Sequence, residues 1–208
     1  MRGRGAIVPL ILVLAFIGCA WIFVRPSEPT ASDLSVLRSV SRLRSPALSN
    51  AFVYLTQLGR TPVVLMFVVV AWRRSRAMAV HLATAILGGE VILQVLKWVI
   101  QRPRPAMILP LVSASGYSFP SGHSLVAAAT YTTAAILICH ELRLPAHRIL
   151  VSAAAVLTIA LVAFSRVYLG VHYASDVIAG ILLGMAWASI LAQRGFHLWN
   201  VPRKDSVG

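Results

Sequence analysis

The chain has few acidic residues, with six Asp and Glu among 208 residues against nineteen Lys and Arg. No two of the six lie close enough in sequence to indicate a metal site built from carboxylates. Cysteines are also scarce: Cys19 and Cys139 are the two, and both fall inside apolar runs. Their placement argues against a disulfide framework and against a zinc site. We therefore expect chemistry that needs no metal ion and no other cofactor.

Charged residues of both signs make up only 12% of the chain, whereas 58% is hydrophobic and the mean hydropathy is +0.80. This composition is too apolar for a soluble globular domain and indicates an integral membrane protein. The length suits one compact membrane domain over residues 1–208, without room for a sizeable soluble domain.

The net charge of +13 raises the question of nucleic-acid binding. The basic residues are scattered among apolar runs and form no clustered binding face, so we exclude a nucleic-acid partner. Anionic lipid headgroups of the bilayer are the expected partner instead. The sequence does not indicate an oligomeric state.

Apolar runs predict an all-α bundle of six transmembrane helices. The first run follows a short basic start. A cleaved signal peptide is the competing interpretation, but no convincing small-residue cleavage site follows the run, which is long enough to span. The second span must include Gln57 and Arg60, because 63–72 alone is too short to cross. The six ranges are about 6–24, 51–72, 77–98, 121–140, 147–165 and 173–193.

Residues 25–50 are polar and contain four arginines. Leucine and valine recur there at a near-helical interval, at Leu34, Leu37, Val40 and Leu43. This pattern predicts a short amphipathic helix on the membrane surface, with a plain solvated loop as the alternative. Whether the segment gates a site is not indicated by the sequence.

Two opposite charges are expected at a similar depth in the second and third spans. Folding these spans back on each other about residues 74–75 places Glu90 level with residue 59, next to Arg60. An unpaired charge at that depth costs at least about 2.5 kcal/mol. The sequence therefore predicts a structural ion pair between Arg60 and Glu90.

Basic residues also bear on orientation, because Lys and Arg are enriched in cytoplasmic loops. Their totals on the two sides are close. The difference becomes clearer once residues with a proposed chemical role are set aside, and it then predicts that both termini are cytoplasmic. The basic positions on the predicted cytoplasmic side are Arg2, Arg4, Arg73, Arg74, Arg76, Arg143, Arg148, Arg194, Arg203 and Lys204.

Three polar stretches fall on the other side of the predicted bundle. The first runs from Lys97 to Arg104-Pro105, where prolines break the helix and turn the chain across the face. The second is Pro120-Ser121-Gly122-His123, which can present free backbone N–H groups to an anion. Taken alone, the first could be interfacial anchors and the second a helix cap.

The third stretch, residues 165–176, contains Arg166, His172 and Asp176. On a helix, the four-residue spacing would stack His172 and Asp176 on one face, where the carboxylate can fix the imidazole tautomer. Arg166 can bind an oxyanion through its fork of N–H donors. A His and an Asp capping a membrane helix is the competing interpretation. Together, two histidines, three cations, an N–H cradle and an orienting carboxylate fit phosphoryl transfer through a phosphohistidine.

These three stretches resemble the signature of the type 2 phosphatidic acid phosphatase family, which vanadium haloperoxidases and glucose-6-phosphatases share. The matched pattern is Lys97-x6-Arg104-Pro105, Pro120-Ser121-Gly122-His123 and Ser165-Arg166-x5-His172-x3-Asp176, without a departure. The resemblance covers residues 97–176, and the six-span layout extends it over most of the chain.

The resemblance implies a role for each matched residue. His172 would be the nucleophile, Asp176 its orienting partner and His123 the general acid that protonates the leaving oxygen. The phosphoryl oxygens would be bound by Lys97, Arg104, Ser121, Gly122 and Arg166. Arg102, Tyr117 and Tyr168 flank the signature without an assigned role.

The expected function is therefore an integral membrane phosphatase of a lipid phosphate, with its active site on the extracytoplasmic face. Polyprenyl (undecaprenyl) diphosphate, phosphatidate and phosphatidylglycerophosphate remain open as substrates, with an inclination towards a prenyl diphosphate or broad specificity. The alternatives are a haloperoxidase, which the apolar spans oppose, and a non-catalytic lipid-phosphate binding or transport protein on the same scaffold.

Overall fold

A computed structural model describes residues 3–24 and 29–195. The polar tail expected after Arg194 lies largely outside these residues, as does Arg2. Within them the chain is all-α, as the sequence predicts, and contains no strand. In chain order the helices are α1 (Gly3–Val24), α2 (Ala31–Ser41), α3 (Pro46–Leu55), the 3-10 helix η1 (Thr56–Gly59), α4 (Thr61–Arg74), α5 (Arg76–Ile100), α6 (Gly122–Glu141), α7 (Pro145–Tyr168) and α8 (Ala174–Gly195).

Among the described residues, five helices are long and apolar enough to cross a membrane: α1, α5, α6, α7 and α8. A sixth span is possible if Pro46–Gly59 and Thr61–Arg74 are counted as one unit, bent by 51°. The range 51–72, expected as the second span, is therefore divided between these two parts. Its break falls at Arg60, whose backbone is extended, and Pro62 in the first turn of α4 provides no backbone N–H.

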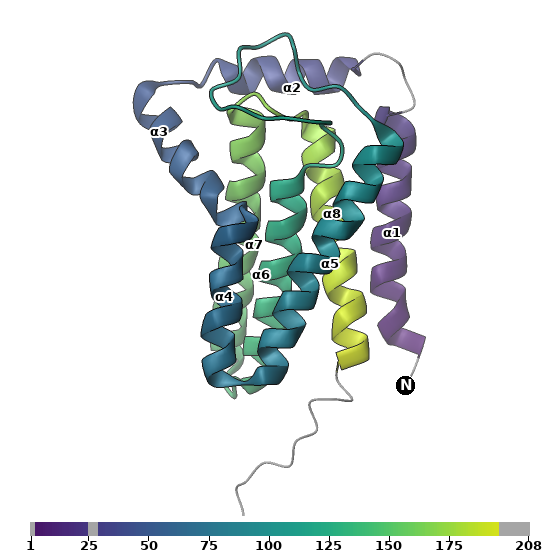
Figure 1. Ribbon diagram of the computed structural model, residues 1–208, viewed down its shortest axis with the longest axis vertical. Helices are drawn as coiled ribbons and strands as arrows, with labels where there is room; N and C mark the ends of the chain where they lie inside the picture. Colours follow the sequence, from purple (N-terminus) through teal and green to yellow (C-terminus); the bar gives the residue numbers. More distant parts are fainter. Residues whose placement is uncertain (1–2, 25–28, 196–208) are drawn as a thin grey trace, which may run out of the picture.

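Helix α6 lies at the centre of the bundle and packs most closely on α8 (Figure 1). Two glycines of α8 permit this contact. A Cβ atom at Gly180 would lie 2.6 Å from the backbone oxygen of Ser121, and one at Gly184 would lie 2.4 Å from that of Leu125. The small-xxx-small pair thus brings the α8 backbone against the first turns of α6. The start of α6 and the start of α8 both contain candidate site residues.

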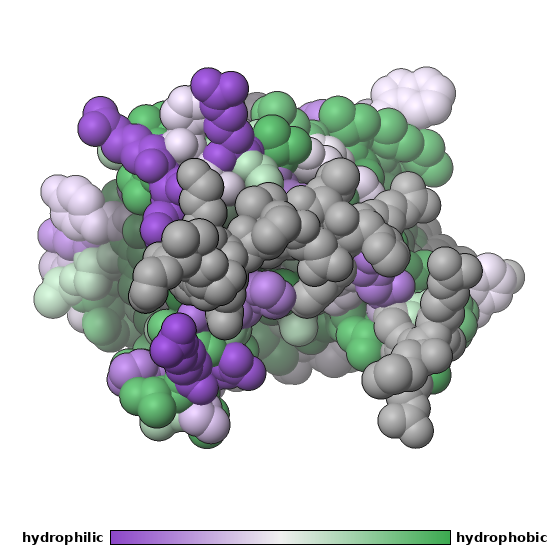
Figure 2. Space-filling view, turned by 90° about the horizontal axis from the view of Figure 1, so that it is seen from below, coloured by the Kyte–Doolittle hydropathy of each residue, from purple (hydrophilic) through white to green (hydrophobic). Residues whose placement is uncertain are grey.

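The outer surface of the bundle is apolar, with exposed side chains such as Leu14 of α1, Val70 of α4 and Leu157 of α7. Lipid tails are the solvent that such a surface requires. At the end where α1 begins and α8 ends, basic side chains of the α4–α5 and α6–α7 turns are exposed. Figure 2 views this end and shows hydrophilic side chains in separate groups.

The opposite end is covered by α2, which lies across the spanning helices (Figure 1). The amphipathic helix predicted within 25–50 is confirmed over Ala31–Ser41, and it buries Leu37 completely against α7 and α8 residues such as Ala163 and Val177. Leu43 lies beyond the helix and is 58% exposed. Helix α2 therefore packs on the same end of the bundle as the three polar stretches.

Candidate active site

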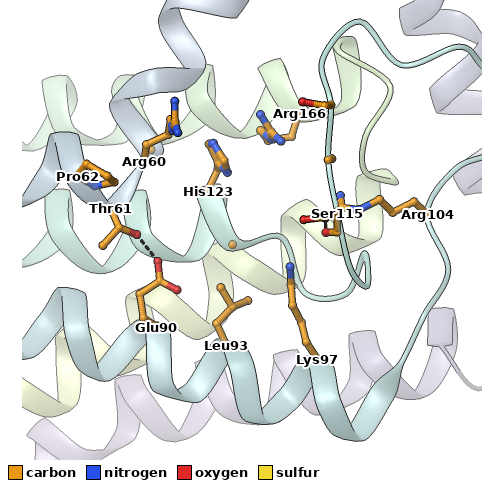
Figure 3. A pocket seen from close by; sticks show the side chains of 14 residues that line it. Arg60, Thr61, Pro62, Glu90, Leu93, Lys97, Arg104, Ser115, His123 and Arg166 are labelled. Atoms are coloured by element: carbon orange, nitrogen blue, oxygen red, sulfur yellow. Dashed lines mark hydrogen bonds between the residues drawn. The ribbon is translucent and has the colours of Figure 1, made fainter.

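The three polar stretches meet at the α2 end of the bundle, around a cavity of about 340 Å³. Lys97 reaches it from the end of α5, His123 from the first turn of α6 and Arg166 from the last turn of α7 (Figure 3). Arg104 enters from the loop between α5 and α6. Residues of the sequence signature from four separate parts of the chain thus line one cavity, whereas His172 and Asp176 are buried and are not among its lining residues.

His172 and Asp176 are neighbours, although not on one helical face as their spacing predicts. His172 lies in the turn before α8, and Asp176 lies in the first turn of that helix. Asp176 Oδ2 accepts a hydrogen bond of 2.9 Å from the backbone N–H of Tyr173 and lies 3.4 Å from His172 Nδ1. The carboxylate therefore caps the N-terminus of α8 and orients the imidazole at the same time.

The neighbours of His172 fix its tautomer. Arg104 Nη1 lies 3.2 Å from His172 Nε2, and a guanidinium can only donate. Nε2 must therefore accept, which leaves the proton on Nδ1 to be donated to Asp176. Complete burial lowers the pKa of His172 to about 4, against the opposing effect of Asp176. At neutral pH the side chain is thus a neutral imidazole whose Nε2 carries no proton and directs its lone pair towards Arg104, which is the protonation state a nucleophile needs.

Arg104 is held in place by backbone carbonyl groups. It donates to the oxygens of Val171 at 2.9 Å, Ser115 at 2.8 Å and Gly116 at 3.0 Å. Burial lowers the pKa of Arg104, although an arginine remains charged at neutral pH. These carbonyls fix the guanidinium beside His172 Nε2 without neutralising its charge.

Arg166 has an unsatisfied donor. Its Nη1 donates to Thr56 Oγ1 at 2.8 Å, but its Nε is buried without a hydrogen-bond partner among the described residues. A buried N–H left unpaired is costly unless a ligand binds it. The ion pairs formed within 3–24 and 29–195 include none of Lys97, Arg104 and Arg166. Three cations thus face one cavity without a carboxylate partner.

The first turn of α6 contributes unequally to the cavity. Gly122 and His123 line it, whereas Ser121 does not. Ser121 is fully buried, and its hydroxyl accepts a hydrogen bond of 3.0 Å from Ser124. A Cβ at Gly122 would lie 2.8 Å from a methyl group of Leu93, so this glycine also lets α6 approach α5. The first residues of α6, whose backbone N–H groups have no partner within the helix, therefore lie at the cavity.

Arg60 and Glu90 both line the cavity, but the ion pair predicted between them is not formed in the structure. Arg60 donates to Gln57 Oε1 at 2.9 Å, and Glu90 accepts a hydrogen bond from the Thr61 hydroxyl. The prediction assumed two straight helices at equal depth. The break at Arg60 instead places Thr61 opposite Glu90 and leaves the guanidinium facing the cavity (Figure 3).

Two residues near Asp176 have no role in the prediction from the sequence. Arg102 contacts Asp176 directly, and Asp33 contacts Arg102. Arg102 donates to Asp176 Oδ1 at 2.5 Å and to Asp33 Oδ2 at 2.8 Å. Arg102 lies inside the first polar stretch, so its position was visible in the sequence. Asp33 had one available signal: it is an acidic residue in the predicted amphipathic helix of a chain with six acidic residues.

In the described part of the chain, no group of three or more His, Cys, Asp and Glu side chains is arranged to hold a metal ion. His123, His172 and Asp176 are surrounded by arginine and lysine, and a cation-rich environment suits an anion. That the chemistry proceeds without a metal remains a prediction.

Comparison with known proteins agrees with this geometry. A profile described as the PAP2 superfamily matches residues 78–199. The chain is 33% identical over 183 residues to phosphatidylglycerophosphatase B of Bacillus subtilis, covering 85% of this chain and 89% of that protein. It is 31% identical over 169 residues to the undecaprenyl-diphosphatase of Sulfolobus acidocaldarius, covering 77% and 76%.

A solved structure is similar over nearly the whole chain. It is the crystal structure of the first transmembrane PAP2 type phosphatidylglycerolphosphate phosphatase from Bacillus subtilis, with a TM-score of 0.83 and 29% sequence identity. The match covers 95% of this chain and 98% of that one.

Proposed function

Since this chain belongs to the PAP2 superfamily and is a multi-pass membrane phosphatase, as its sequence signature predicts, we propose that it hydrolyses a lipid phosphate through a phosphohistidine at His172. The observation that carries the proposal is the pair formed by a neutral His172 Nε2 and three cations without carboxylate partners. An anion with a phosphoryl group in reach of Nε2 fits both features.

In the first step, His172 Nε2 attacks phosphorus, and the bond between phosphorus and the leaving oxygen breaks. A protonated His123 gives its proton to that oxygen. A bond between phosphorus and Nε2 forms, and the imidazole becomes positively charged. Asp176 Oδ2, facing Nδ1–H, stabilises that charge, while Arg104, Arg166 and Lys97 bind the equatorial phosphoryl oxygens.

In the second step, water attacks phosphorus and the bond to Nε2 breaks. The neutral His123 left by the first step accepts the proton of the water. Inorganic phosphate is released, His172 returns to its neutral form and His123 is again protonated. Both steps use side chains and water alone, so the proposed reaction needs no metal ion.

The substrate we favour is a membrane lipid diphosphate, such as a polyprenyl diphosphate. His123 protonates the leaving oxygen, so the remainder of the substrate lies on its side of the cavity. Gly59 packs against His123, since a Cβ at Gly59 would lie 2.9 Å from the His123 carbonyl oxygen. The next residue, Arg60, faces the cavity with a charge that no carboxylate pairs within the described residues, so it can bind the second phosphate of a diphosphate.

The orientation we propose has both termini cytoplasmic and the active site at the extracytoplasmic membrane face. Its support is that α1 begins and α8 ends at the end opposite the site (Figure 1), and that the arginines of the α4–α5 and α6–α7 turns at that end are exposed. At the other end a headgroup can reach the cavity while its tails stay in the bilayer. Labelling of single cysteines at Ser75 and Met107 from either side of sealed cells tests the orientation.

The proposed function is tested by phosphate release from purified protein in EDTA, with polyprenyl diphosphate, phosphatidate and phosphatidylglycerophosphate as substrates. His172→Ala is the matched variant. We expect release in EDTA from the wild type, fastest with the diphosphate, and none from the variant. A folded wild type that releases phosphate from no lipid would support a binding or transport protein instead.

A further inference from the structure

A chain of buried charges extends from the proposed nucleophile to the surface helix α2. From it we propose that Asp33 is a positioning residue for the reaction, acting on His172 through Arg102 and Asp176. This inference rests on the proposed phosphatase function. Asp33 does not line the cavity, so its effect must travel through its neighbours.

Arg102 bridges two carboxylates that lie far apart in sequence. Its Nη1 donates to Asp176 Oδ1 at 2.5 Å and its Nη2 to Asp33 Oδ2 at 2.8 Å. The exposed fraction of the side chain is 6% for Arg102, 2% for Asp33 and 0% for Asp176. Burial alone would lower the pKa of Arg102, but the two carboxylates outweigh it and raise that pKa. The guanidinium is therefore a permanent charge between two anions.

Asp33 also binds the residue before Asp176. Its Oδ1 accepts from the Ser175 backbone N–H at 3.0 Å, and its Oδ2 accepts from the Ser175 hydroxyl at 2.6 Å. Arg102 Nη1 in turn donates to the same hydroxyl at 2.8 Å. Asp33 is thus fixed to the first turn of α8, the turn that places Asp176.

In this arrangement the two oxygens of the Asp176 carboxylate have different partners. Arg102 occupies Oδ1, which leaves Oδ2 for Tyr173 N–H and His172 Nδ1. Asp33 keeps the guanidinium in the orientation that serves Oδ1, and Arg102 Cζ lies over the Tyr173 ring, 4.5 Å from its centroid. Without Asp33, Arg102 would be a buried cation with one carboxylate for its two terminal nitrogens, free to turn towards Oδ2 and compete with His172.

The competing explanation is that Asp33 only anchors α2. Helix α2 already has an apolar anchor in Leu37, which is fully buried against residues of α7 and α8. If Asp33 only anchors α2, replacing it would change stability or lower activity by the same factor whether or not Asp176 is present. A positioning role requires Asp176, and the two explanations therefore differ in a double-mutant cycle.

The experiment measures kcat and KM for phosphate release by wild type, Asp33→Asn, Asp176→Asn and the double variant. The Asp33→Asn side chain is isosteric with the original, but it presents an amide NH₂ or a neutral oxygen to Arg102. We expect Asp33→Asn to lower kcat about tenfold in the wild type and less than about twofold in the Asp176→Asn background. KM should change little, since neither residue lines the cavity.

A matched control is Glu141→Gln, which removes an exposed carboxylate paired with Arg74 at the other end of the bundle and should leave kcat unchanged. If Asp33→Asn does not fold, Arg102→Lys replaces it in the cycle, because one ammonium cannot serve both carboxylates with the fork geometry of arginine. Equal losses with and without Asp176, or no loss at all, would overturn the inference. A wild type inactive on every lipid would instead overturn the proposed function.

Discussion

Both ends of the bundle carry basic side chains, but they differ in burial and in what the charges contact. At the α4–α5 and α6–α7 turns, arginines are exposed, and the described ion pair there joins Arg74 and Glu141 with exposed fractions of 71% and 37%. At the α2 end, Arg102 and Arg166 are buried. An exposed charge costs little free energy, because it stays in water, and it can set the orientation of the protein in the membrane. Buried charge is costly and is retained where it holds a site together.

The largest effect is expected from replacing a buried cation of the site while keeping its charge. Arg166→Lys removes the unpaired Nε and the hydrogen bond to Thr56. Two hydrogen bonds to charged groups correspond to a loss in kcat/KM of about 10²-fold or more. Phosphate release measures the effect. Arg73→Lys at the opposite end is the control and should leave kcat/KM unchanged. Equal losses of kcat/KM from the two substitutions would show that the burial of an arginine does not decide its effect on activity.

A smaller and selective effect is expected at Arg60, which belongs to the site but is exposed. Arg60→Gln should lower kcat/KM for a lipid diphosphate about tenfold, because it removes one charged contact to the second phosphate. For the matching lipid monophosphate the change should be less than about twofold. Competition between the two substrates measures the ratio directly. Equal losses on both would mean that Arg60 does not bind a second phosphate.

The burial of His172 predicts a pH dependence of stability. Its pKa is about 4 in the folded protein against 6.5 for an ordinary histidine, so between these values the unfolded chain binds a proton that the folded protein does not. Stability contributed by the neutral imidazole is therefore present above pH 6.5 and is lost as pH falls towards 4. The decrease in Tm from pH 7 to pH 4.5 in detergent should be smaller in His172→Gln than in the wild type. An identical decrease would contradict the burial of a neutral imidazole.

The smallest effect is expected at the exposed ion pair of the opposite end. Arg74→Gln should cost less than about 1 kcal/mol, since exposed pairs contribute little. Its kcat should equal that of the wild type. A loss of activity comparable to that of Arg166→Lys would show that the two ends are coupled.

The sequence predicts the fold and the family better than the contacts between residues around the site. The membrane fold and the family follow from apolar runs and from a signature whose residue types are dictated by phosphate binding. The predicted Arg60–Glu90 ion pair is wrong because a break in a helix is not visible in hydropathy. Thr61 lies opposite Glu90, where an unbroken helix would place Arg60. Asp33 and Arg102 are missed because their contacts join residues 69 and 142 positions apart, and no local periodicity reports such contacts.

The central claim is that the buried charges of the α2 end make His172 a nucleophile. The most direct test is to quench purified protein during turnover of a lipid diphosphate whose terminal phosphate is radiolabelled, and to map the label by peptide mass spectrometry. The account predicts an acid-labile, base-stable phosphoryl group on the peptide that contains His172, formed in EDTA and absent from His172→Ala. Phosphate release at the wild-type rate by His172→Ala, or a label on another residue, would contradict it.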